Sequence, residues 1–118
     1  MTEDELLSAI LELAKFAGFR RCHFRPARTA KGWRTAVQGD PGFPDLILVG
    51  HKRFICAELK SNEGALSRSQ IAWIEQILDT KVEWYLWSPS DWIDGMIAKA
   101  LGCEGGVISE AAACGSRG

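Results

Sequence analysis

Three ionisable side chains in the middle of the chain have types and a spacing that could do chemistry together. Asp45 follows Gly-Phe-Pro, Glu58 lies thirteen residues later, and Lys60 is two residues beyond it. Burying two carboxylates side by side is unfavourable unless a cation joins them. Mg²⁺ and Mn²⁺ prefer oxygen ligands and bind through one or two carboxylates, waters and substrate phosphates. With Lys60 to hold or activate an attacking water, the set predicts a metal-dependent phosphodiesterase site.

A β-hairpin is predicted to bring these side chains together. Residues 45–49 and 54–60 are short apolar and β-branched segments on either side of a turn at His51 and Lys52. A two-residue turn there pairs residues whose numbers sum to 103, so the aspartate lies directly opposite the glutamate. Opposed residues share a face with Cβ atoms about 4.5–5.5 Å apart, and the lysine shares that face because side chains alternate with period two.

Two capping boxes predict where helices begin. Thr2 and Glu5 form the first, ahead of an apolar stripe at helical spacing that ends before Gly18. Ser67 and Gln70 form the second, and we expect this helix to cover the sheet. Its predicted buried face consists of Ile71, Trp73, Ile74, Ile77 and Leu78.

Weaker patterns predict the remaining elements. A short strand near residues 21–25 and a long loop follow the first helix, and residues 82–87 alternate as a further strand. Residues 91–101 carry apolar side chains at helical spacing and predict a closing helix. We therefore expect one domain over residues 1–102 and a flexible C-terminal tail over residues 103–118.

Basic side chains gather ahead of the hairpin. Residues 20–60 hold nine basic against three acidic side chains, although the whole chain has a net charge of -1. Such a stretch can neutralise the phosphates of a nucleic acid, and the alternative is a solvated loop. The candidate DNA-binding residues are Arg20, Arg21, Arg25, Arg28, Lys31 and Arg34, with Trp33 to stack on a base. The tryptophans within periodic segments are expected in the core: Trp73, Trp84, Trp87 and Trp92.

Over residues 2–101 the chain resembles a known nuclease family. The motifs that carry the resemblance are Gly42-Phe43-Pro44-Asp45-Leu46, Ala57-Glu58-Leu59-Lys60, and Gln70 with Trp73. They are similar to those of the VRR-NUC (virus-type replication-repair nuclease) branch of the PD-(D/E)xK nucleases. The resemblance implies an α/β fold of the restriction-endonuclease type, with a mixed central sheet flanked by helices.

The resemblance also implies roles for individual residues. Asp45 and Glu58 would bind Mg²⁺ or Mn²⁺ together with the backbone carbonyl of Leu59, and Lys60 would assist the attacking water. A glutamate in the first helix and a glutamine in a later helix complete the family's site, and these look like Glu3 and Gln70. Both have a structural alternative. Glu3 also suits a helix N-terminus through the macrodipole, and the glutamine also suits a helix cap.

The function that the resemblance implies is metal-dependent hydrolysis of DNA. Standalone members are similar to junction resolvases, which act on branched DNA as homodimers, so DNA and a second copy of the chain are the expected partners. A role in replication, recombination or packaging would follow. Two alternatives stay open: a DNA-binding module without catalysis, and a flap or nonspecific nuclease that uses the same site.

The composition restricts the other possibilities. With 118 residues, 47% hydrophobic and 25% charged, the chain is expected to form one soluble domain rather than a disordered chain or a coiled coil. It lacks the apolar run of about 20 residues that a membrane span needs and a basic N-terminal signal, so we expect a cytoplasmic protein. The resemblance implies that the cell is bacterial or phage-infected. No organic cofactor is expected.

The cysteines have no CxxC spacing, so reduced thiols are expected at Cys22, Cys56, Cys103 and Cys114. A zinc site made of Cys22, His23 and Cys56 would match no usual ligand spacing. His23 could contact a phosphate or carry a proton, although a lone histidine on a strand is more often packed or solvated.

Overall fold

The computed structural model describes residues 1–24, 27–34, 37–104 and 107–108. Its centre is a mixed sheet of four strands in the order β1-β4-β5-β6. These strands are β1 (Arg20–His23), β4 (Leu46–Gly50), β5 (Arg53–Leu59) and β6 (Glu83–Trp87). β4 is antiparallel to both β1 and β5, and β6 runs parallel to β5.

The predicted hairpin and its register are confirmed. β4 and β5 pair from Leu46 opposite Ala57 to Gly50 opposite Arg53, so that partner numbers sum to 103. His51 and Lys52 form the turn with φ of 53° and 62°. Positive φ at both central residues is the geometry that matches the twist of the two strands.

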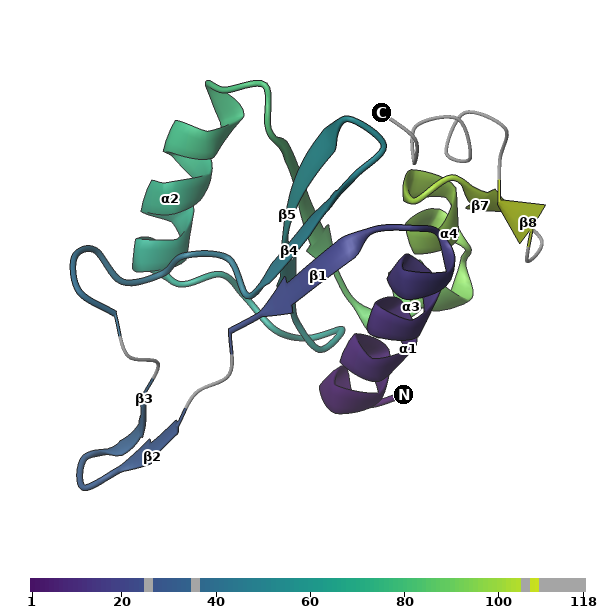
Figure 1. The fold of residues 1–118 in the computed structure, drawn as a ribbon. Coiled ribbons are helices and arrows are strands. Elements are labelled where there is room, and N and C mark those ends of the chain that lie inside the picture. The colour runs from purple at the N-terminus through teal and green to yellow at the C-terminus, as the bar shows by residue number, and fades with distance from the viewer. Residues whose placement is uncertain (25–26, 35–36, 105–106, 109–118) are drawn as a thin grey trace.

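Both predicted capping boxes are also confirmed. α1 (Glu3–Phe16) begins after Thr2, and α2 (Arg68–Leu78) begins after Ser67. The main core lies between the buried face of α1 and one face of the sheet, with Ile97 and Leu101 closing it. α2 lies on the opposite side of the sheet (Figure 1).

The buried face of α2 is narrower than predicted. Ile74 and Ile77 are buried, whereas Ile71 and Leu78 are 41% and 63% exposed. The reason is that the main strand contact of α2 is with the edge strand β6. The tryptophans differ from the prediction as well, because Trp87 alone among the four is buried and the others are half-buried.

The closing helix is divided. α3 (Pro89–Ile93) and α4 (Met96–Ala100) are separated by Gly95, whose φ of 78° ends the first helix. Ile93 and Met96 next to this break are exposed, contrary to the apolar stripe predicted for one continuous helix. Helical spacing cannot reveal such a break, because the left-handed residue interrupts the stripe without changing the residue types.

Two further hairpins lie outside the sheet. In place of the predicted long loop, β2 (Ala27–Thr29) pairs with β3 (Gly32–Arg34), and the pair projects away from the sheet (Figure 1). β7 (Cys103–Glu104) pairs with β8 (Val107–Ile108). Because Cys103 is buried in the core, the packed structure continues past the predicted boundary at residue 102. Residues 109–118 of the predicted tail lie outside the described residues.

Among the described residues, no helix has the length and apolar character that crossing a membrane would require.

Candidate active site

Asp45 and Glu58 lie at the position where the ladder of β4 and β5 ends. The last pair in the ladder is Leu46 with Ala57, so the same register places Asp45 directly opposite Glu58. The backbone N–H of Leu59 donates to Asp45 Oδ2 at 3.4 Å. Since Leu46 and Ala57 face the main core, Asp45 and Glu58 lie on the opposite face, on the side of α2.

Glu58 is a buried carboxyl group with an unsatisfied oxygen. Its side chain is 2% exposed, and Oε1 has no hydrogen-bond partner among the described residues. The pKa of Glu58 is raised to about 9, first by burial and then by a hydrogen bond with Asp45, the charge of Asp45 and the charge of Glu3. Lys60 acts in the opposite direction. The fold therefore brings three predicted site residues, Asp45, Lys60 and Glu3, within electrostatic reach of Glu58.

This arrangement fits a divalent cation. Two carboxyl groups in hydrogen-bond contact must share a proton, and a bound cation could replace that proton. Within the described ranges, no three His, Cys, Asp or Glu side chains converge into a ligand set. The oxygen donors of the carboxylate pair match the preference of Mg²⁺ and Mn²⁺.

The zinc alternative is not supported. Cys22 is exposed and Cys56 is buried, and they are not gathered with His23 into a ligand set in the described part of the chain. Cys103 is also a free, buried thiol, whereas Cys114 lies outside the described residues.

Lys60 is held just past the end of β5. Its backbone N–H donates to the carbonyl of Trp87 at 3.0 Å, which continues the pairing with β6. A Cβ atom added at Gly64 would lie 3.1 Å from Lys60 Cβ and 3.3 Å from its Cδ. Gly64 thus leaves space for the aliphatic part of Lys60. The Lys60 side chain is half-buried, and its positive charge is close enough to lower the pKa of Glu58.

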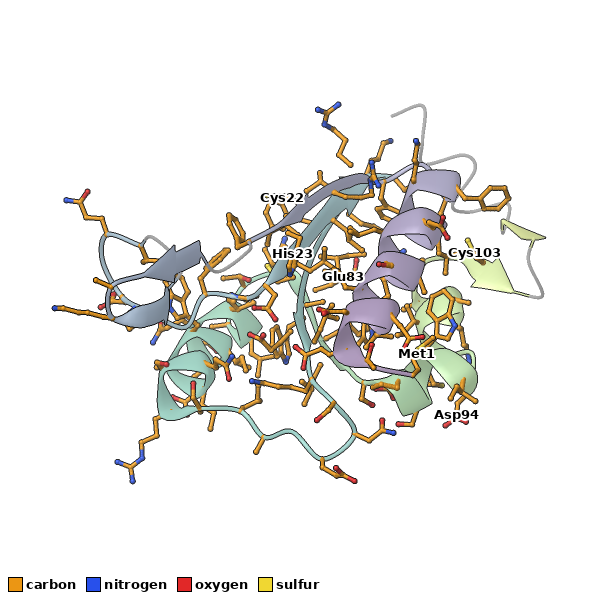
Figure 2. The ribbon with its side chains drawn as sticks, turned by 90° about the horizontal axis from the view of Figure 1, so that it is seen from below. Met1, Cys22, His23, Glu83, Asp94 and Cys103 are labelled. Atoms are coloured by element: carbon orange, nitrogen blue, oxygen red, sulfur yellow. The ribbon has the colours of Figure 1, made fainter. Side chains whose placement is uncertain are left out.

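Glu3 reaches the site from the first turn of α1. A hollow of about 240 Å³ is bordered by Glu3, His23, Asp45 and Leu59, together with two further residues of α1. Figure 2 shows His23 alongside α1. The capping box sets the start of the helix, and packing of the helix on the sheet directs its first turn towards the carboxylates.

Gln70 is placed as a helix cap. Its Oε1 accepts from the N–H of Ser67 at 2.8 Å, and its own N–H donates to Ser67 Oγ at 3.2 Å. The start of α2 lies against the segment that precedes Asp45, because a Cβ atom at Gly42 would lie 2.5 Å from the carbonyl of Ser69. Of the two alternatives for Gln70, the contacts present are those of the cap.

A second hollow adjoins the carboxylates, and the sequence did not predict it. It has a volume of about 540 Å³ and is bordered by Phe24, Phe43 and Trp73, with Asp45 at its edge. Trp73 Nε1 donates to the carbonyls of Asp40 at 3.2 Å and Pro41 at 3.0 Å. Trp73 was expected in the core because helical spacing does not distinguish a core stripe from one that faces a hollow. The Gly-Phe-Pro-Asp motif was the signal that could have associated Phe43 with the site.

The predicted basic residues are distributed over both faces of the sheet. Arg20 is exposed and pairs with Val49, on the face of the carboxylates. Arg21 lies on the other face, where Nη1 donates to the carbonyl of Leu11 at 3.4 Å. Lys31 is exposed between β2 and β3. Arg25 lies outside the described residues, as do the side chains of Arg28, Trp33 and Arg34.

The fold resembles that of a solved VRR_NUC domain protein. No model of a protein family matches the chain, and no curated protein does. A solved structure described as a VRR_NUC domain protein aligns with a TM-score of 0.50 and 18% identity, over 92% of this chain and 97% of that one. At this identity the likeness concerns the fold. The predicted α/β class, a mixed sheet flanked by helices, is confirmed, and the chain shares its fold with this VRR_NUC domain protein.

Proposed function

We propose that the chain is a metal-dependent DNA endonuclease that hydrolyses phosphodiester bonds at the site of Asp45, Glu58 and Lys60. The observation that carries the proposal is Glu58, a buried carboxyl group with an unsatisfied oxygen beside a second carboxyl group. A purely structural role would not favour this arrangement, because a buried polar atom without a hydrogen-bond partner is costly. The fold shared with a VRR_NUC domain protein supports the same conclusion.

In this proposal Asp45, Glu58 and the carbonyl of Leu59 hold Mg²⁺ or Mn²⁺. The ion supplies Lewis-acid stabilisation of charge on the phosphate oxygens. Lys60 orients the attacking water through a hydrogen bond and offers a positive charge to the phosphate. Glu3, across the hollow, orients further water molecules towards the phosphate.

Arg20 and the other basic residues ahead of the hairpin position the DNA by contacts with its backbone. Such contacts set the register of the duplex and carry no sequence information. We therefore assign the enzyme no base-specific recognition. A preference would then arise from the shape of the DNA, and branched DNA is the proposed substrate. One chain carries one site, so paired cuts in a junction require a homodimer.

The test is cleavage of end-labelled four-way junction, flap and linear duplex DNA with Mg²⁺, Mn²⁺ or EDTA. We compare the wild type with Lys60→Ala and with Lys52→Ala, a matched control in the exposed turn of the hairpin. The proposal predicts metal-dependent cuts that Lys60→Ala loses and Lys52→Ala retains.

Each outcome separates one function from another. Symmetrical paired cuts in the junction alone, with a dimeric mass by light scattering, would establish a dimeric resolvase. Equal cutting of all substrates would indicate a nuclease without junction selectivity. Tight binding with no cutting under any metal condition would refute catalysis and leave a DNA-binding module.

A further inference from the structure

The aromatic hollow beside Asp45 has no part in the reaction proposed above. Phe24 and Phe43 are 40% and 38% exposed, and Trp73 is half-buried. Ring centroids are 5.8 Å apart between Phe24 and Phe43 and 5.0 Å apart between Phe43 and Trp73, in both cases edge to face. The three rings form a connected wall outside the main core.

This wall is held in place by the backbone around it. The indole N–H of Trp73 donates to two carbonyls of the segment that leads to Phe43. Gly42 in that segment has a φ of 100° and lies against the start of α2. A set of exposed rings that is fixed in this way costs little entropy when it binds a flat ligand.

The aromatic hollow is continuous with the candidate active site. Phe24 and Asp45 border both hollows, so a strand whose phosphate lies at the carboxylates can reach the rings with a neighbouring nucleotide. The backbone N–H of Phe24 donates to the carbonyl of Asp45 at 2.9 Å, which holds the backbone of this residue beside the site. The volume of about 540 Å³ falls within the range of small-molecule sites.

We propose that this hollow binds an unpaired nucleobase of the DNA strand that occupies the active site. The proposal rests on the nuclease function and adds a specificity site to it. Every base has a π-face that can stack on an aromatic side chain, so stacking tolerates any sequence. Gln38, at the rim, has an amide that can donate to and accept from a base edge. A base in an intact duplex is stacked on its neighbours and cannot enter, so DNA with an unpaired nucleotide at the cut is favoured.

The test is binding of two duplexes to the full chain in EDTA, where no cleavage occurs. One duplex is fully paired, and the other carries a single unpaired 2-aminopurine, whose fluorescence falls when it stacks on an aromatic ring. We compare the wild type with Phe43→Ala, Phe43→Trp and Phe43→Leu. Phe54→Ala is the matched control, because Phe54 is 47% exposed and does not border the hollow. Thermal denaturation of each variant verifies its folding.

The proposal predicts that the wild type binds the unpaired duplex more tightly and quenches the probe. In Phe43→Ala and Phe43→Leu, the ratio of the affinity for the unpaired duplex to that for the paired duplex should fall about five-fold or more. Phe43→Trp and Phe54→Ala should retain it. An equal affinity of the wild type for both duplexes, or an unchanged preference in folded Phe43→Ala, would overturn the proposal.

Cleavage of the same duplexes with Mg²⁺ separates this proposal from the nuclease assignment. Cutting by the wild type with no effect of Phe43→Ala on the preference would refute the stacking site and retain the nuclease. Quenching that depends on Phe43 without any cutting would retain the stacking site and refute catalysis.

Discussion

Replacing Glu58 by glutamine should remove activity and stabilise the metal-free protein at pH 8. The pKa of Glu58 is raised from its ordinary 4.5 to about 9, chiefly by burial. The folded chain therefore retains a proton that the unfolded chain releases as the pH rises. For a group with a raised pKa, stability is fully present below the unfolded pKa and is lost as the pH rises towards the folded one. The metal-free wild type should thus lose stability between about pH 4.5 and pH 9.

The magnitude follows from the shift in this pKa. Each pH unit of difference corresponds to about 1.4 kcal/mol, and pH 8 lies about 3.5 units above the ordinary pKa of Glu58, so keeping the group protonated there costs about 5 kcal/mol. A glutamine is uncharged, has nearly the same shape as a protonated glutamate and can donate to Asp45, although burying its amide also has a cost. We expect Glu58→Gln to raise the unfolding free energy by roughly 2 kcal/mol at pH 8 and to lower it by roughly 2–3 kcal/mol at pH 4.5, where only the cost of burying the amide remains.

The assay is urea denaturation in EDTA at several pH values, with the exposed Glu75→Gln on α2 as the control. Addition of Mg²⁺ should stabilise the wild type and leave Glu58→Gln almost unchanged, because binding to the folded state alone stabilises it. A folded Glu58→Gln variant that is less stable than the wild type at pH 8, or a difference that does not vary with pH, would refute this reasoning.

Three further predictions concern the supports of the site. Arg53→Ala removes the ion pair in which two guanidinium nitrogens of Arg53 donate to the two carboxylate oxygens of Glu83 on β6, each at 2.7 Å. The free energy of unfolding, measured by urea denaturation, should fall by about 1 kcal/mol. The hydrogen bonds from Arg53 lower the pKa of Glu83, so the loss of stability in Arg53→Ala should become smaller as the pH falls through that lowered pKa. Gly42→Ala would place a Cβ atom 2.5 Å from backbone and should lower both stability and cleavage, whereas Gly39→Ala, also at positive φ but in open space, should lower stability by only about 1–2 kcal/mol. Arg20→Ala should weaken DNA binding more than Arg21→Ala, because Arg20 shares the face of the carboxylates; equal losses in a binding titration would contradict this placement.

The elements that the sequence predicted well are those set by neighbouring residues. The turn at His51 and Lys52 determines the register of β4 and β5, because a two-residue turn leaves one pairing available. The two capping boxes determine where α1 and α2 begin through contacts three residues apart. The same locality explains why the pairing of Asp45 with Glu58 could be anticipated from residue numbers alone.

Elements whose form depends on distant packing were predicted less well. The closing helix is broken at Gly95, and the predicted long loop contains the hairpin of β2 and β3. Ile71 and Leu78 were expected in the core and are exposed, since the main strand contact of α2 is with the edge strand β6. In each case the spacing of apolar residues was compatible with two structures, and the position of the neighbouring elements decided between them.

The sequence by itself determined which residues could do chemistry and how the hairpin pairs them, because strand alternation and turn length are local properties. Only the tertiary structure decided that Glu58 is buried with an unsatisfied oxygen, since burial depends on everything packed around the strand. It also decided that Glu3 reaches Glu58 from the far end of the sequence and that Trp73 faces a hollow beside Asp45. These are contacts between segments far apart in the chain, and no local pattern encodes them.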